Sequence, residues 1–186
     1  MKKIIESIYD LVASLTAAVL IIVLLFIFVF RVVGVSGESM LPTLQDGNWL
    51  AVTACKQTYH YKDIVIVTEP NALSEPIVKR VIATGGQWVN VDYDTGYVYV
   101  GDTADTMEKL DEPYTASLTD VRHIDDENEY PIQVPQGKLF CMGDNRNHST
   151  DSRSYLVGFV DERFVMGKAF TRFIPMGQFD IYESSK

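Results

Sequence analysis

One serine, Ser39, stands in a setting that suits nucleophilic chemistry, within the sequence Gly-Glu-Ser-Met-Leu-Pro-Thr-Leu at residues 37–44. Glycine permits close approach of the backbone to a substrate, and proline fixes its own φ while restricting the residue before it. A serine hydroxyl is a weak nucleophile and needs a base beside it. Most serines only cap helices or solvate turns. Ser39 is therefore a candidate nucleophile only if the chain also supplies that base.

One candidate base is Lys79, which interrupts the apolar sequence Ile-Val-Lys-Arg-Val-Ile at residues 77–82. Alternation along a strand places Lys79 on the same face as Ile77 and Val81, and Arg80 on the opposite face. Apolar neighbours disfavour the ammonium form and lower its pKa, so that a neutral amine becomes available to accept the Ser39 proton. Alternatively, Lys79 lies at a sheet edge and extends its ammonium group into water.

The other candidate bases are the three histidines of the chain. His60 falls in a predicted loop and His123 in an acidic segment, whereas His148 lies in the polar run at residues 143–153. Asp144 or Asp151, from the same run, would complete a Ser-His-Asp triad with it. From the residues alone, a lysine base and a histidine base both remain open.

Several stretches together resemble bacterial type I signal peptidase, the membrane-anchored serine protease that removes signal peptides. Residues 37–44 resemble the nucleophile box of that family, residues 78–82 its general-base box, and residues 143–153 its G-D-N-x-x-x-S-x-D-S-R box. The sequence Gly-Lys-Ala at residues 167–169 resembles a short C-terminal motif. The matches follow the family order from about residue 31 to 174. A single membrane span and a short chain match the Gram-positive type.

The resemblance implies a Ser/Lys dyad, in which Ser39 forms an acyl-enzyme intermediate and Lys79 is the general base. Ser149 would orient the lysine amine, and Met40 would pack against Lys79 and exclude water. Gly37 occupies the position where some family members carry a serine hydroxyl for the oxyanion hole, so a backbone amide is the expected second donor. The resemblance implies four more supporting residues: Asp151 and Arg153 as an ion pair, and Asp144 and Asn145 as residues that shape the loop.

The implied function is cleavage of signal-peptide-bearing pre-proteins with small side chains at substrate positions −1 and −3. No metal and no cofactor are expected. Two alternatives stay open: a related Ser/Lys peptidase with another substrate, and an inactive membrane-anchored β module that only binds partners. The joint presence of Ser39, Lys79 and Ser149 argues against the inactive module.

A long apolar segment precedes Ser39 in the sequence. Residues 11–30 contain no charged residue, and at about 1.5 Å per residue they span about 30 Å, the thickness of the hydrocarbon core of a membrane. We expect an uncleaved transmembrane helix, because the apolar core of a secretory signal is shorter. Lys2 and Lys3 before the span predict a cytoplasmic N-terminus at residues 1–10. Residues 31–186 are then extracytoplasmic at the cell membrane, with the lipid bilayer as a partner.

The chain after this segment shows the alternation and turn signals of β structure. Strands are predicted at residues 49–52, 64–67, 76–83, 139–142 and 164–174, with a hairpin that joins 88–91 to 97–100. We therefore expect a mostly β, monomeric catalytic domain of the signal-peptidase type behind one helix.

Charge is concentrated in one segment. The chain carries a net charge of −9, which excludes nucleic acid as an expected partner. Residues 102–129 hold ten acidic and two basic residues. We predict an acidic insertion at about 101–131 with a solvated surface, since the spacing of a calcium loop is absent. Cys55 and Cys141 lack metal-binding spacing and are expected to be small buried hydrophobes, while a disulfide between them outside the cytoplasm stays open.

Overall fold

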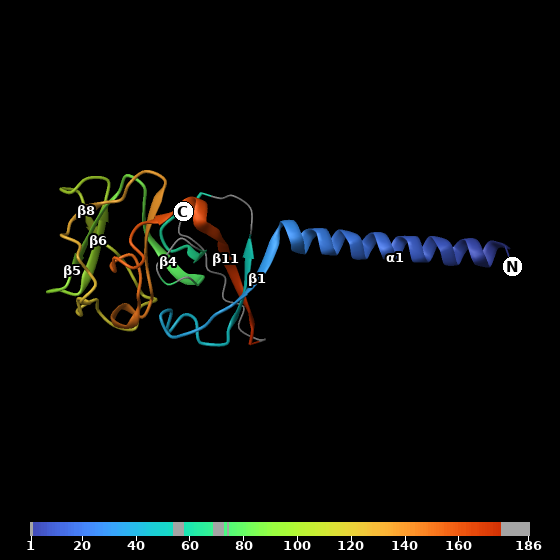
Figure 1. The fold of residues 1–186 in the computed structure, drawn as a ribbon, viewed down its shortest axis with the longest axis horizontal. Coiled ribbons are helices and arrows are strands. Elements are labelled where there is room, and N and C mark those ends of the chain that lie inside the picture. The colour runs from blue at the N-terminus through green and yellow to red at the C-terminus, as the bar shows by residue number, and fades with distance from the viewer. Residues whose placement is uncertain (1, 54–57, 69–72, 74, 176–186) are drawn as a thin grey trace.

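A long helix projects from a β domain in the computed structural model, which describes residues 2–53, 58–68, 73 and 75–175 (Figure 1). The helix, α1, spans Lys2–Phe28, and its segment Lys3–Leu24 is long and apolar enough to cross a membrane. The helix begins before the predicted start at residue 11 because the charged lead is also rich in helix-forming residues. It ends before the predicted limit because Phe30 pairs with Thr53 in a sheet.

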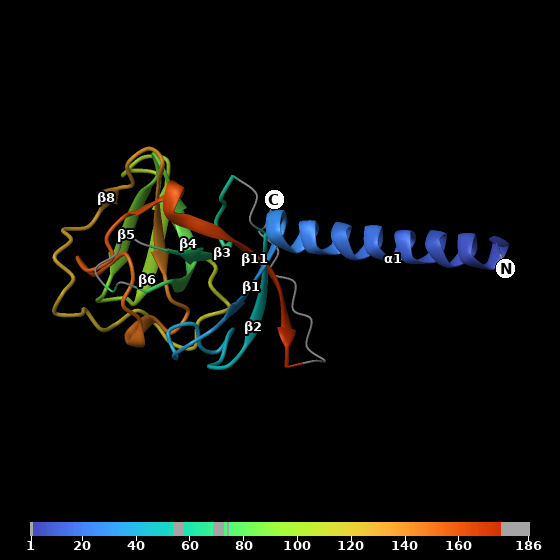
Figure 2. The same ribbon diagram turned by 45° about the vertical axis from the view of Figure 1, so that its right-hand side comes forward.

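The larger sheet has seven antiparallel strands in the order β1-β2-β11-β3-β4-β9-β10. The sheet lies at the end of the domain from which α1 departs (Figure 2). The predictions for five of its strands are confirmed to within one residue, whereas β1 and β10 were not predicted. The strands are β1 (Phe30–Gly34), β2 (Trp49–Thr53), β3 (Ile64–Val67), β4 (Ile77–Thr84), β9 (Lys138–Met142), β10 (Val160–Asp161) and β11 (Val165–Ile174).

The smaller sheet has four strands in the order β7-β6-β5-β8 and lies at the end of the domain remote from α1 (Figure 1). The predicted hairpin is confirmed, with Asp92 opposite Tyr97 across the turn. The acidic insertion runs from β6 to β8 and contains β7. The strands are β5 (Trp88–Asp92), β6 (Tyr97–Gly101), β7 (Glu108–Lys109) and β8 (Ile132–Gln133).

Apolar packing fixes the loop that joins β1 to β2. Met40 and Leu44 from this loop are almost fully buried, in a cluster that includes Leu50, Val52 and Ile64. Burying a side chain of this size contributes about 1.5–3 kcal/mol. The residues on both sides of Ser39 are therefore tied to the larger sheet.

The acidic insertion differs from its prediction. Many of its acidic side chains are exposed, but Thr119 and Asp126 are buried, and Glu112 forms an ion pair with a buried arginine. The solvated-surface prediction is wrong for these three residues, because the insertion folds back onto the loop after β9.

Cys141 is buried as predicted, whereas Cys55 lies outside the described residues.

Candidate active site

A tight loop after β1 presents Ser39. Gly37 has a φ of +85°, a left-handed value that favours glycine, and its N–H donates to Asp46 Oδ1 at 2.9 Å. The Leu44 N–H donates to the Met40 carbonyl at 2.8 Å and closes the following turn. The predicted glycine–proline setting thus forms a turn whose far side is anchored in the core and whose Ser39 side chain is half-buried.

Lys79 in β4 reaches Ser39. Its Nζ is hydrogen-bonded to Ser39 Oγ at 2.8 Å and donates to the Val78 carbonyl at 3.1 Å. Only 3% of Lys79 is exposed, because β4 lies inside the sheet between β3 and β9. Burial lowers the pKa of Lys79, and the nearby negative charges of Asp151 and Asp144 only partly oppose this shift. The alternative of a sheet-edge lysine in water is therefore wrong.

The loop after β9 closes against the serine turn. The Asn145 N–H donates to the Ser39 carbonyl at 3.0 Å, and Asn145 Nδ2 donates to the Glu38 carbonyl at 3.1 Å. A Cβ at Gly143 would lie 2.4 Å from the Ser39 carbonyl oxygen and 2.2 Å from Ser149 Oγ. Gly143 is thus required for this close approach. Because β9 pairs with β4, the loop also lies beside Lys79.

Ser149 is buried, and its hydroxyl faces the Asp151 carboxylate, whose pKa it helps to lower. The hydroxyl lies against Gly143 at the junction of the two loops. No hydrogen bond joins it to Lys79 within the described residues, so the predicted orienting role remains a prediction.

Two buried ion pairs hold the loop after β9. Arg80 donates from Nε and Nη2 to the two carboxylate oxygens of Asp144 at 2.7 and 2.6 Å. Arg153 donates in the same way to Asp151 at 2.8 and 2.9 Å, and the Gly143 N–H adds a bond of 2.9 Å. Burial acts to raise the pKa of Asp151, but Arg153 and the Gly143 N–H outweigh it and the pKa is lowered.

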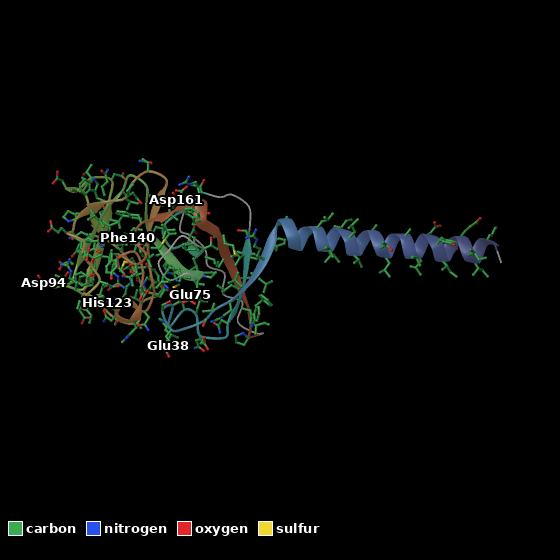
Figure 3. The ribbon with its side chains drawn as sticks, in the orientation of Figure 1. Glu38, Glu75, Asp94, His123, Phe140 and Asp161 are labelled. Carbon is green, nitrogen blue, oxygen red and sulfur yellow. The ribbon has the colours of Figure 1, made fainter. Side chains whose placement is uncertain are left out.

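A groove of about 570 Å³ opens beside the Ser39–Lys79 contact. Its apolar wall includes Met40, Ile66 and Val78, and Met40 is also part of the core cluster. Glu38 and Glu75 also line the groove, and Figure 3 shows where they lie in the domain. The groove thus has both apolar and polar lining residues, carboxylates among them, and it is open to the Ser39–Lys79 contact.

The histidines do not replace Lys79 in this geometry. His148 lines the groove but is exposed, and no hydrogen bond joins it to Ser39 among the described residues. The carboxylates of Asp144 and Asp151, the possible third members of a triad, are bound to arginines. The described residues also contain no cluster of His, Cys, Asp and Glu that could hold a metal ion.

Sequence reasoning missed the partners of the loop after β9. Arg80, Arg146, Glu112 and Tyr114 form one connected cluster behind the loop. A signal was available for Arg80, because an arginine between Val78 and Ile82 in a buried strand requires an acidic partner. No comparable pattern in the sequence identified Glu112 among ten acidic residues.

Comparison with known proteins places this chain in a family. Residues 8–174 match the family described as "Signal peptidase, peptidase S26". A probable signal peptidase I-1 of Synechocystis sp. is 34% identical, covering 91% of this chain and 84% of that one. A signal peptidase I of Bacillus licheniformis is 34% identical, covering 93% and 92% of the two chains, and a signal peptidase IB of Staphylococcus aureus (strain COL) is 32% identical, covering 94% and 93%.

A crystal structure of a signal peptidase I from Enterococcus faecalis V583 aligns with a TM-score of 0.44 at 25% identity, covering 61% of this chain and 98% of that one. Family membership rests on the sequence matches, which extend over the helix, the serine turn, β4 and the loop after β9. This chain therefore belongs to the signal peptidase family, peptidase S26, and its activity is that of a signal peptidase I.

Proposed function

We propose that the chain removes signal peptides with a Ser39/Lys79 dyad. The observation that carries the proposal is the 2.8 Å contact between Ser39 Oγ and the amine of a buried lysine whose pKa is lowered. The neutral Lys79 amine accepts the hydroxyl proton as Ser39 Oγ attacks the scissile carbonyl. The resulting ammonium then protonates the leaving amine, and an acyl-enzyme on Ser39 remains. Lys79, neutral again, activates the water that hydrolyses it.

The Ser39 N–H is one donor of the proposed oxyanion hole. This N–H belongs to the residue that carries the nucleophile, and it makes no hydrogen bond within the described part of the chain. The Gly37 N–H already donates to Asp46 and is therefore not available as the second donor. Donors must lie about 2.7–3.1 Å from the developing oxyanion, so we assign the second place to another backbone amide of the turn.

The supporting residues act on the geometry of the dyad. Asn145 holds the Ser39 carbonyl, and Asp144 ties its loop to Arg80, the residue after Lys79. The Asp151–Arg153 pair fixes Gly143. Ser149 orients the neutral amine once substrate closes the groove, and Met40 keeps water from one side of it. The apolar residues of the groove wall, Met40, Ile66 and Val78, are proposed to receive small side chains at substrate positions −1 and −3.

Cleavage of a pre-protein tests the proposed function. The full-length protein in detergent is incubated with a secretory pre-protein, and the product is identified by N-terminal sequencing. We expect one cut, directly after a small residue with a second small residue two positions earlier. A peptidase with another substrate would leave the pre-protein intact, and a binding module would yield no product with any substrate.

The pH dependence of kcat/KM follows from Lys79. The rate should rise with pH as the amine loses its proton, because only the neutral form accepts the Ser39 proton. Since burial lowers the pKa of Lys79, the midpoint should lie below the ordinary lysine value of about 10.4. A pH series of initial rates checks this. A midpoint near 6.5 that disappears on removal of a histidine would contradict the lysine assignment.

We also propose the topology in the membrane. The span at residues 11–30 crosses the bilayer, Lys2 and Lys3 keep residues 1–10 in the cytoplasm, and the β domain is a monomer outside. Three large apolar side chains form a second contact with lipid. Val32, Trp49 and Ile174 are each more than 40% exposed, and the register of β1, β2 and β11 places them on one face of the sheet near α1.

A truncated protein tests the second contact. Removal of residues 1–28 leaves β1 intact, and the β domain should still associate weakly with liposomes, because tryptophan favours the membrane interface. Trp49→Ser should lower the bound fraction in co-sedimentation several-fold, whereas Tyr155→Ser, a substitution at another exposed aromatic residue outside the larger sheet, should not. Equal binding by the two variants would show that Trp49 makes no contact with lipid, and a truncated protein that does not bind at all would show that α1 alone anchors the chain.

A further inference from the structure

The acidic insertion contacts the loop after β9 along most of that loop's length. Asp120 accepts a hydrogen bond from Asn147 Nδ2 at 2.7 Å, and Asn128 Nδ2 donates to the Arg153 carbonyl at 2.8 Å. The Tyr155 N–H donates to the Asp125 carbonyl at 3.0 Å. The loop after β9 is therefore held between the serine turn on one side and the acidic insertion on the other.

The strongest of these contacts is made by Arg146, which is 1% exposed although it is a charged residue. Its Nη1 donates to Glu112 Oε2 at 2.7 Å, its Nη2 donates to Glu112 Oε1, and Nη1 also reaches Thr119 Oγ1 at 3.2 Å. Its Nε donates to the Gly143 carbonyl at 3.2 Å. One guanidinium group thus connects the insertion directly to the glycine that packs against Ser39.

Tyr114 extends the connection to β4. The centroid of its ring lies 4.0 Å from the Arg80 guanidinium carbon, and its hydroxyl donates to Glu112 Oε1 at 2.9 Å. Burial raises the pKa of Tyr114, so the ring remains neutral. Arg80 in turn holds Asp144. Glu112 contacts Arg146, and Tyr114 contacts Arg80, so the two residues reach two of the three arginines that restrain the loop after β9.

We propose that Glu112 is a positioning residue for the Ser/Lys dyad and that it acts through Arg146. Glu112 fixes the Arg146 guanidinium, Arg146 fixes the Gly143 carbonyl, and Gly143 and Asn145 fix Ser39 against Lys79. A displacement of about 1 Å at the reacting groups lowers a rate as much as 10²-fold even when its origin is remote. This role rests on the dyad described under the proposed function, and it gives the acidic insertion a part in catalysis.

The test is Glu112→Gln, which keeps the shape of the side chain and removes its charge. We expect kcat for pre-protein cleavage to fall at least about tenfold while KM changes less than about twofold, since Glu112 does not line the groove. Glu108→Gln is the matched control, because Glu108 is an exposed acidic residue of the same insertion whose side chain makes no hydrogen bond or ion pair to any described residue. It should keep wild-type kcat.

A double-mutant cycle with Arg146→Met shows whether Glu112 acts through Arg146. If it does, Glu112→Gln should lower kcat no further in the Arg146→Met protein. Wild-type kcat in Glu112→Gln, or effects that multiply in the double variant, would overturn the proposal. Should Glu112→Gln not fold, Thr119→Val removes a single Arg146 acceptor and should lower kcat without changing KM. Full activity in the Thr119→Val protein would also reject the positioning role of Glu112.

Different variants test the Ser/Lys dyad and the positioning role of Glu112. Cleavage by a Ser39→Ala protein would reject the dyad itself, whatever the effect of Glu112→Gln. A dyad that requires Ser39 and Lys79 but is indifferent to Glu112 would reject only the positioning role.

Discussion

Lys79→Arg is expected to reduce pre-protein cleavage at least about 10³-fold, as far as Lys79→Ala and Ser39→Ala do. Residues that act as one unit fail together, so each single change removes nearly the whole dyad contribution. Arginine retains the positive charge and can occupy similar space, but it stays protonated at any accessible pH and cannot accept the Ser39 proton. Initial rates of cleavage in detergent, with folding checked by circular dichroism, provide the measurement.

The histidine alternative supplies the control. His148→Ala removes an exposed side chain that lines the groove, and it should cost only a few-fold in kcat/KM. Wild-type rates in Lys79→Arg would reject the lysine base outright. A loss in His148→Ala as large as the loss in Ser39→Ala would instead restore the Ser-His-Asp triad.

The local patterns in the sequence were sufficient for the longer interior strands and for the turn that carries Ser39. Runs of β-branched residues with turn residues at their ends predicted β3 and β4 to within one residue, because these strands bury apolar side chains along most of their length. β1 was missed because it follows α1 directly. Its short Phe-Arg-Val-Val-Gly sequence continues the apolar character of the helix, and only pairing with β2 separates the two.

The partners across the site were harder to predict, because they depend on which strands are neighbours. The strand pattern left Lys79 equally compatible with burial and with an exposed edge, and the position of β4 between β3 and β9 decided for burial. In the same way, the acidic composition of residues 102–129 predicted solvation on average. It gave no sign that Glu112 would meet Arg146, 34 residues further along the chain.

Asp151→Asn is expected to lower the free energy of unfolding at pH 7 by about 3–5 kcal/mol, since breaking a buried ion pair leaves an uncompensated charge. Asp151 is fully buried, and Arg153 is 1% exposed. The substituted amide would also place a donor opposite the guanidinium group, whose Nη1 already lacks a partner among the described residues. Urea unfolding of the full-length protein in detergent, followed by tryptophan fluorescence, measures the change.

The pH dependence identifies the origin of this loss. Because the folded protein lowers the pKa of Asp151, the ionised carboxylate stabilises the fold above the unfolded pKa of about 3.9, and this stabilisation is lost as the pH falls through the lower folded value. The gap between wild type and Asp151→Asn should therefore be constant from pH 7 to about pH 5 and narrow below about pH 4. Asp102→Asn, at an exposed acidic residue, should show almost no gap at any pH. A gap that persists unchanged at pH 3 would mean that the side-chain packing of Asp151, and not its charge, supports the loop beneath Ser39.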